Sequence, residues 1–380
     1  MNATTHDAFL GGQGVPVDPS RIEAELQGLW GPAAEEAGGP DIDHPNVTKL
    51  VLANLVVSAF GPGSDAHAPV LEEVLARFPC RAIVLRRDDE PGRRVRAEVS
   101  AVCHLPAPGR PQVCSERIVL HAGADALDML PGAIRPLLES DLPFILWWTD
   151  DPRETPKLFT DLLDEVTRAV IDRHDPTADP SFLTGLPGWA VVRDAAWFGI
   201  SNWRELIAQL FDPMTARGEL DRIASVEMVV RAPSTERIPR AVAWLSAWLA
   251  GQLGWTLKER REEAGGGLSA LFLGPTGDVK ITARVVLNPE AKRAQFNEVV
   301  LTTRHDDGEG TFHLRRVPER PEEVRIEVCS STHCSLPRLV RVPELGAVRR
   351  VASALEARRE DEPYVKALPI ARRLLGLDGP

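Results

Sequence analysis

The sequence predicts an α/β N-terminal domain with a mixed, partly parallel sheet, followed by an α+β domain with an antiparallel strand meander. Up to about residue 215, β-branched apolar runs alternate with amphipathic stretches of helical spacing, which is typical of a sheet covered by helices. Beyond that point a long helical stretch precedes a series of short strand-like runs, which indicates a separate unit. A chain of 380 residues has room for two or three such domains.

The first half of the chain begins with an apolar, β-branched run at 48–60 that predicts a buried strand. A helix at 67–77 and a strand at 81–87 follow. Two alternating runs at 95–105 and 112–121 flank the loop PAPGRP, and they predict an antiparallel hairpin. The elements expected next are a helix at 125–139, a strand at 141–148, a helix at 155–166, a strand at 168–174 and a helix at 202–212.

The second half begins with IASVEMVVRA at 223–232, which predicts a strand, and continues with a long amphipathic helix at 237–255. After this helix we expect only short strands. We therefore divide the chain into an acidic flexible tail at 1–44, an α/β domain at 45–215 and an α+β domain at 216–380.

The N-terminal 44 residues are strongly acidic, because they contain eight Asp and Glu side chains and only one basic residue, Arg21. A short amphipathic stretch, IEAELQGLW, occupies positions 22–30. One hypothesis is a mobile tail that contains a small docking helix. The alternative is a segment that becomes ordered on a partner, with Leu26, Leu29 and Trp30 as its apolar face.

Composition and charge exclude several classes of protein. Hydrophobic residues make up 43% and charged residues 26% of the chain, as in ordinary globular proteins. No run of about 18 apolar residues predicts a membrane-spanning helix, and the first residues do not resemble a signal peptide. A net charge of −11 argues against a nucleic-acid partner. Five cysteines, an odd number in a long chain, indicate a reducing, cytoplasmic location.

The turn after the first strand offers a candidate phosphate site. Residues 61–66 match G-x-G-x-x-A, a loop whose backbone N–H groups hold a pyrophosphate in dinucleotide-binding folds. However, Pro62 lacks an N–H group and Asp65 adds a like charge, so the alternative is a plain turn followed by a helix cap.

The end of the strand FILWW offers a second candidate. Asp150 and Asp151 follow this strand at the edge where ligands bind in open α/β sheets, and paired carboxylates can act as acid and base. The alternative is ordinary turn chemistry at Asp151-Pro152. Trp147 and Trp148 point to opposite faces, so one fills the core and the other lies under a helix or at an interface. These four residues are the candidate partner contacts.

The cysteines suggest two further possibilities. Cys329, His333 and Cys334 offer three zinc ligands, but a closed site needs four and no second pair stands out, so we predict no metal. If the loop at 106–111 closes a regular hairpin, Cys103 lies opposite Cys114, within reach of a disulfide. This redox pair is weighed against two buried cysteines that act as small hydrophobic side chains.

The order of several runs is similar to that in one bacterial family. The most specific runs are LPFILWW at 142–148 and WRELIAQLFD at 203–212. The others are FPCRAIVL at 78–85, AEVSAVC and VCSERIVL within 97–120, and AVIDRHD at 169–175. On these residues the chain resembles the OpcA family of glucose-6-phosphate dehydrogenase assembly proteins. The resemblance covers about 45–215 well and continues more loosely into 216–310.

The resemblance implies a non-catalytic assembly factor or allosteric activator of glucose-6-phosphate dehydrogenase, which supports the oxidative pentose phosphate pathway. It provides no catalytic residues and no cofactor, and the absence of hydrolase, P-loop and metalloprotease motifs agrees with this expectation. Some members of this family are under thiol control, so the resemblance implies a redox role for Cys103 and Cys114. The alternative is a sugar-phosphate- or nucleotide-binding enzyme or sensor that uses the loops at 61–65 and 149–152. A third hypothesis is a structural paralogue with another partner.

Overall fold

The computed structural model describes residues 12–36, 47–61, 68–88, 92–104, 112–173, 180–183, 192–212, 217–306, 308–329, 334–357 and 361–377. The chain forms two compact units that interleave along the sequence. The first unit is drawn from residues 1–173, 187–194 and 347–356, and the second from 174–186, 195–346 and 357–380. The domain boundary near residue 215 stays a prediction.

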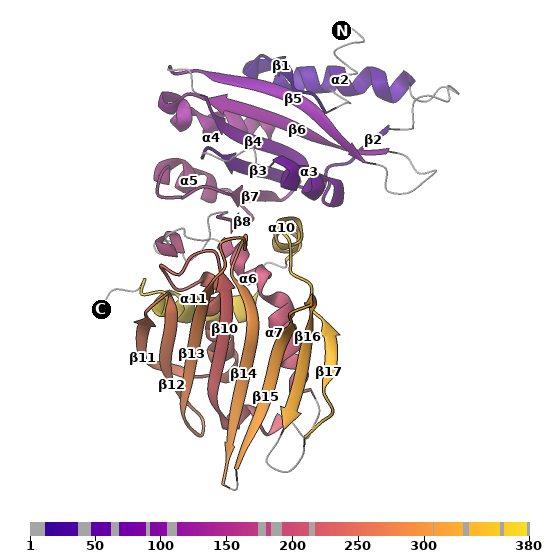
Figure 1. Ribbon diagram of the computed structural model, residues 1–380. Coiled ribbons are helices and arrows are strands. Elements are labelled where there is room, and N and C mark those ends of the chain that lie inside the picture. Colours follow the sequence, from indigo (N-terminus) through magenta and orange to yellow (C-terminus); the bar gives the residue numbers. More distant parts are fainter. Residues whose placement is uncertain are drawn as a thin grey trace. The chain divides into compact units, whose positions relative to one another are not determined.

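The described part of the first unit is built on a nine-stranded sheet (Figure 1). Its strands lie in the order β1-β5-β6-β4-β3-β7-β8-β9, and β2 pairs with β6. The run from β6 to β9 is parallel, whereas β5 is antiparallel to both of its neighbours. The mixed, partly parallel sheet is therefore confirmed. The strands are β1 Val15–Val17, β2 Val47–Lys49, β3 Asn54–Ala59, β4 Arg81–Arg87, β5 Val95–His104, β6 Gln112–Ala122, β7 Phe144–Trp148, β8 Arg168–Ile171 and β9 Val192–Asp194.

Helices from distant parts of the sequence share a core with this sheet. Residues of β3, β4 and β7 form one buried cluster with Val74 of α3 and with Val351 and Leu355 of α10. The α-helices of this unit are α2 Ile22–Glu36, α3 Ala68–Arg77, α4 Leu130–Ile134, α5 Pro156–Leu163 and α10 Ala347–Glu356. Three 3-10 helices accompany them: η1 Pro19–Arg21, η3 Ala124–Met129 and η4 Arg135–Leu137.

The N-terminal segment differs from the flexible tail that its composition predicts. Strand β1 extends the sheet beside β5, and Ile22, Leu26 and Leu29 of α2 are buried. The indole Nε1 of Trp30 donates a hydrogen bond to Glu116 of β6 at 2.7 Å. The apolar face of α2 is therefore covered within the chain itself. Residues 1–11 and 37–46 lie outside the described part of the chain.

Two expected elements of the first unit are divided. The run at 48–60 forms two strands, β2 and β3, because Leu50 N donates to Cys114 O and Leu52 N donates to Pro79 O, on different neighbours. The helix expected at 125–139 is only one short α-helix between two 3-10 helices. Pro131 and Pro136 lack the N–H groups that a continuous helix needs.

The described part of the second unit is built on an eight-stranded sheet, in the order β11-β12-β13-β10-β14-β15-β16-β17. Neighbours are antiparallel except β10 and β13, which run parallel because helix α9 connects β10 to the strands that follow. The antiparallel meander is thus confirmed, with β10 inserted in it. The strands are β10 Ile223–Ala232, β11 Thr256–Glu263, β12 Gly267–Gly274, β13 Gly277–Leu287, β14 Gln295–His305, β15 Gly308–Val317, β16 Arg320–Cys329 and β17 Arg338–Arg341.

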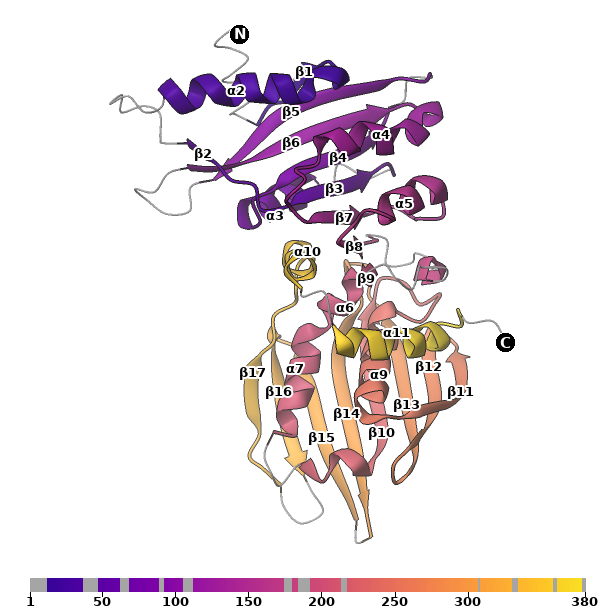
Figure 2. The same ribbon diagram turned by 180° about the vertical axis from the view of Figure 1, so that it is seen from behind.

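The helices of the second unit pack on one face of this sheet (Figures 1 and 2). They are α6 Ala195–Gly199, α7 Ser201–Leu210, α9 Arg240–Leu253 and α11 Glu362–Leu374, with the 3-10 helices η5 Pro180–Leu183 and η6 Leu220–Arg222. Helices α10 and α11 correct the expectation of strands alone after residue 255. Helix α11 carries its own start signal, because the side chain of Asp361 accepts a hydrogen bond from Tyr364 N.

Helix α7 confirms the buried stripe that its spacing predicts, because Trp203, Leu206, Ile207 and Leu210 are each at most 4% exposed. We expect Leu210→Ala to lower the free energy of unfolding by about 2–5 kcal/mol, since it leaves a cavity. Urea denaturation followed by circular dichroism measures this change, with the exposed Gln209→Ala as a matched control. A loss below about 1 kcal/mol would show that this face of α7 is not packed.

Candidate functional site

The candidate site is the edge of the first sheet where the parallel strands β3, β7 and β8 end. Parallel strands bring their carboxyl ends to one edge, where ligands bind in open α/β sheets. Phe60 and Gly61 follow β3, Asp150 and Asp151 follow β7, and Asp172 follows β8. The expected strand-end acids therefore do lie at a common edge.

Asp150 closes the end of β3. Its carboxylate accepts hydrogen bonds from Phe60 N at 3.1 Å and from Gly61 N at 2.8 Å. A Cβ on Gly61 would lie 3.0 Å from Asp150 Oδ1, so the contact is tight. The amide of Gly61 belongs to the start of the candidate phosphate loop. A phosphate in that loop would accept hydrogen bonds from backbone amides, but here the carboxylate of Asp150 accepts them. Residues 62–65 of that loop lie outside the described residues.

The neighbouring backbone is held in register by a serine and a threonine. Thr149 N donates to Ser58 Oγ at 2.9 Å, and Thr149 Oγ1 donates to Ser58 O at 2.6 Å. Both side chains are buried. The ends of β3 and β7 are thus fastened by side chains as well as by the sheet, which fixes the position of Asp150.

Asp151 is paired with two arginines. It accepts hydrogen bonds from Arg153 N and Arg153 Nε, each at 3.0 Å, and from Arg153 Nη2 at 2.7 Å, and it pairs with Arg173 Nη1. Burial acts to raise the pKa of Asp151, but the hydrogen bonds from Arg153 and the charge of Arg173 outweigh it and lower the pKa to about 2. This carboxylate stays ionised and is a poor candidate for a proton donor near neutral pH.

Asp172 is also engaged, since its Oδ1 lies 3.8 Å from Nη2 of the buried Arg350 in α10. Each strand-end acid thus has a partner within the same unit. Sequence reasoning placed Asp150 and Asp151 at the end of β7 but missed their partners. Only Arg153 left a local signal, because it stands two residues after Asp151.

Trp147 and Trp148 are both fully buried, on opposite faces of β7. Trp147 belongs to the core cluster with α3 and α10. Trp148 lies under α5, with its ring centroid 5.0 Å from that of Phe159 and 6.0 Å from that of Phe60. Of the four candidate partner contacts, the two indoles therefore offer no surface here, and a contact at this edge stays a prediction for Asp150 and Asp151.

The charge state of Asp151 predicts a pH dependence of stability. Its folded pKa lies below the ordinary value of about 3.9, so its contribution is complete above about pH 4 and is lost as the pH falls toward 2. We expect Asp151→Asn to lower the free energy of unfolding by about 2 kcal/mol at pH 7 and by clearly less at pH 3. Urea titrations at both pH values measure this, with the exposed Asp164→Asn as control. An equal loss at pH 7 and pH 3 would contradict the assignment.

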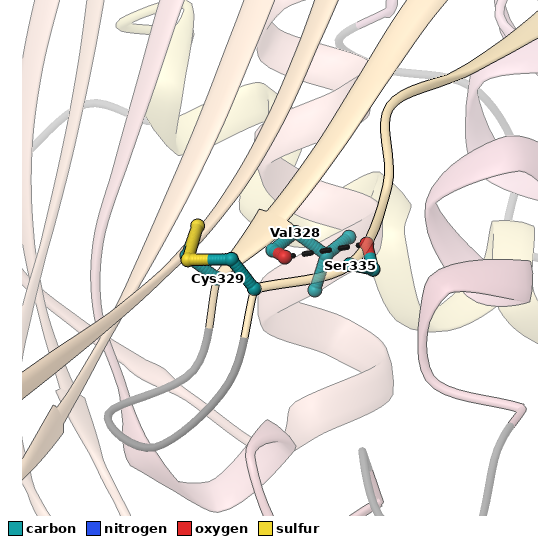
Figure 3. Close-up of a disulfide and its surroundings, with 4 residues drawn as sticks. Val328, Cys329 and Ser335 are labelled. Atoms are coloured by element: carbon teal, nitrogen blue, oxygen red, sulfur yellow. Dashed lines mark hydrogen bonds between the residues drawn. A yellow bond between two sulfur atoms is a disulfide. The ribbon is translucent and has the colours of Figure 1, made fainter.

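Four of the five cysteines form disulfides. Cys329 and Cys334 form a disulfide and an isolated β-bridge, and Ser335 Oγ donates a hydrogen bond to Val328 O at 3.3 Å (Figure 3). Two bonded sulfurs do not serve as thiolate ligands, and His333 lies outside the described residues. Among the residues that the structure describes, no group of three His, Cys, Asp or Glu side chains is arranged to hold a metal.

The hairpin register confirms that Cys103 lies directly opposite Cys114, and a disulfide joins them. Their redox role stays a prediction. We expect the bond to open in a reductant and to return after mild oxidation, whereas Cys80 stays unmodified in the folded chain because burial raises the pKa of its thiol. Alkylation followed by mass spectrometry measures both. If Cys103 and Cys114 are alkylated separately after oxidation of the folded protein, the pair is part of the core and not a switch.

The fold defines a protein of two units. At the edge of the first sheet, the carboxylate of Asp150 accepts hydrogen bonds from the backbone amides that follow β3. The chain belongs to the OpcA family of glucose-6-phosphate dehydrogenase assembly proteins. The profile described as "Glucose-6-phosphate dehydrogenase subunit N-terminal domain" matches residues 71–185, and the corresponding C-terminal domain profile matches residues 190–368.

Individual relatives agree with this assignment. A protein of Synechocystis sp. that is named as an OxPP cycle protein, OpcA, is 28% identical over 56% of this chain and 45% of its own length. The protein of the same name from Synechococcus elongatus is 28% identical over 63% of this chain and 57% of its own. The chain thus spans about half the length of the curated relatives it matches.

Solved structures that are similar to the chain include oxidoreductases. One from Sinorhizobium meliloti covers 86% of this chain and 97% of its own, with 10% identity and a TM-score of 0.48. At that level of similarity we draw no functional argument from it.

Proposed function

We propose that this chain is a non-catalytic partner that promotes the assembly or activity of glucose-6-phosphate dehydrogenase, and so supports the oxidative pentose phosphate pathway. Family membership supports the choice of partner. The observation that carries the non-catalytic part is the Asp150 carboxylate on the amides of Phe60 and Gly61. A phosphate at that position would have to displace a carboxylate and would meet a like charge.

The main alternative is an enzyme or sensor that binds a sugar phosphate or a nucleotide at the loops 61–65 and 149–152. This alternative needs strand-end amides that are open to a phosphate and a carboxylate that can exchange a proton. Among the described residues, Asp150 occupies the amides of Phe60 and Gly61, and the two arginines hold Asp151 in its ionised form. The same contacts therefore favour the partner hypothesis.

The proposal also includes the kind of partner and the location of the protein. The partner is a protein, with no nucleic acid and no membrane involved, and the location is cytoplasmic. The net charge of −11 supports the first exclusion. No helix in the described part of the chain is long and apolar enough to cross a membrane.

Thermal unfolding of the isolated chain with NADP⁺ or glucose 6-phosphate separates the two hypotheses. A ligand at 100 times its dissociation constant stabilises a folded protein by about 2.7 kcal/mol, which raises the Tm by several degrees. We expect no shift with either compound. A saturable shift that Asp150→Ala enhances, because the amides become free, would support the ligand-binding alternative instead.

A further inference from the structure

We infer that helix α10 is a latch that couples the second unit to the strand-end edge of the first unit. The chain leaves the second unit after residue 346, forms α10 in the first unit, and returns to the second unit at residue 357. Both ends of α10 are therefore joined along the chain to the unit in which the helix does not pack.

The docking of α10 is built from one face of a short helix. Val351 and Leu355 are at most 1% exposed, and they belong to the core cluster that includes Trp147 of β7. Gly346, at the N-cap, has no side chain to cap the helix. Because a helix of about ten residues is marginal in water by itself, α10 depends on this burial for its stability. We therefore expect it to dock and undock as one small unit.

Two polar contacts connect α10 to β8 and to the acid that follows this strand. Arg168 of β8 donates through Nη1 to Leu355 O, one of the last carbonyls of α10, which have no partner within the helix. A cation at this end also complements the helix dipole. Arg350 Nη2 lies 3.8 Å from Oδ1 of Asp172, and both side chains are buried. Docking of α10 thus brings a counter-charge to the strand-end acid Asp172.

The flanks of α10 are fastened within the second unit. Before the helix, Asn202 Nδ2 of α7 donates to Pro343 O at 2.7 Å. After the helix, Asp361 accepts a hydrogen bond from Trp197 Nε1 of α6 at 3.0 Å. These two anchors stand only a few residues from the ends of α10. Because the connecting segments are short, a shift of either anchor acts directly on the docking of α10.

The strand-end edge therefore depends on a segment far along the chain, since Arg168 and Leu355 are 187 residues apart. Undocking of α10 would leave Asp172 buried without the nearby charge of Arg350, which is costly, so the end of β8 should open together with α10. The second sheet should stay closed in this opening. A partner that binds near the anchors and favours one state of α10 would then change the edge as well.

The first test is native-state hydrogen exchange of the full chain, followed by mass spectrometry. Leu355→Ala weakens the docking of α10, and Leu26→Ala in α2 is the matched control, because it truncates an equally buried leucine of another helix of the same unit. We expect Leu355→Ala to speed exchange at least about tenfold in α10 and at the ends of β7 and β8, and less than about twofold in β10. Leu26→Ala should leave all of these regions within about twofold of the wild type. Leu355→Val is a milder variant that gives the same pattern if Leu355→Ala yields too little folded protein.

The second test moves an anchor without touching the first unit. Asn202→Ala removes the hydrogen bond to Pro343 O, so the tether of α10 becomes longer and its effective concentration at the docking site falls. We expect exchange in α10 and at the end of β8 to become several-fold faster. The exposed Gln209→Ala on the same helix is the control and should change neither.

Three results would overturn the inference. If Leu355→Ala speeds exchange in α10 alone, the edge does not depend on the helix. If exchange rises equally in β10, the chain opens as a whole and α10 is no separate latch. If α10 and the edge respond to Leu355→Ala but not to Asn202→Ala, the helix is not coupled to the second unit. Each result is independent of whether the chain acts on the dehydrogenase, so the proposed function stands or falls separately.

Discussion

Arg81→Ala is expected to lower the free energy of unfolding by about 3–5 kcal/mol, because it leaves a buried carboxylate without its guanidinium. Arg81 is 3% exposed, and its Nε lies 2.6 Å from Oε2 of Glu116, which is fully buried. The same guanidinium pairs with Glu23 of α2, lies 2.9 Å from Glu139, and donates to Leu137 O at 2.9 Å. Burial acts to lower the pKa of Arg81, and these carboxylates outweigh it and raise the pKa, so the guanidinium stays charged.

The expected loss is larger than that of any surface pair. Arg93→Ala is the matched control, because Arg93 lies 2.9 Å from Asp128 and both side chains are at least half exposed. Such pairs contribute at most about 1 kcal/mol. Urea denaturation followed by circular dichroism measures both variants. If Arg81→Ala costs no more than Arg93→Ala, the network does not fasten α2 to the sheet.

Trp244→Ala is expected to cost about 3–5 kcal/mol, because Trp244 is the fully buried centre of an aromatic cluster in the second unit. Its ring centroid lies 5.0 Å from that of Tyr364 and 5.5 Å from that of Trp197. Arg204 stacks 3.6 Å above Trp197, and Trp197 Nε1 donates to Asp361 at 3.0 Å. Burial lowers the pKa of Arg204 to about 10, against the opposing charge of Asp361, so this arginine still carries its charge at pH 7.

The control for Trp244 lies on the same helix. Gln252 of α9 is exposed, so Gln252→Ala should change the free energy of unfolding by less than about 0.5 kcal/mol. Circular dichroism is the appropriate probe, because removing an indole alters the fluorescence itself. A loss below about 1 kcal/mol for Trp244→Ala would mean that the cluster does not hold α9 and α11 together.

The sequence predicted the parts of the fold whose signals are local. The period-2 runs of β5 and β6 located the hairpin and placed Cys103 opposite Cys114, because a regular ladder fixes every pair once one pair is known. The helical spacing of Trp203 to Leu210 likewise identified a buried stripe. Helix α10 was missed because no side chain caps its start. The helix expected at 125–139 was predicted too long, because Pro131 and Pro136 interrupt it.

The rest depends on contacts between residues far apart in the sequence. By composition, the N-terminal 44 residues resemble a solvated acidic tail. Two contacts that the sequence does not reveal hold part of this segment on the sheet: Arg81 donates a hydrogen bond to Glu23, 58 residues away, and Trp30 donates one to Glu116, 86 residues away. The candidate site shows the same limit. Asp150 was located at a strand end, but its hydrogen bonds to Phe60 and Gly61, about 90 residues away, decide whether that edge is open.

The most direct test of the central claim measures the dehydrogenase of the same organism with and without an equimolar amount of this chain. Steady-state rates against glucose 6-phosphate, together with sedimentation velocity of the mixture, report activity and assembly in one set of samples. We expect a species heavier than either protein alone and a changed maximal rate or KM, while the chain alone reduces no NADP⁺. Reduction of NADP⁺ by the isolated chain, or an unchanged rate, KM and sedimentation profile of the dehydrogenase, would contradict the account.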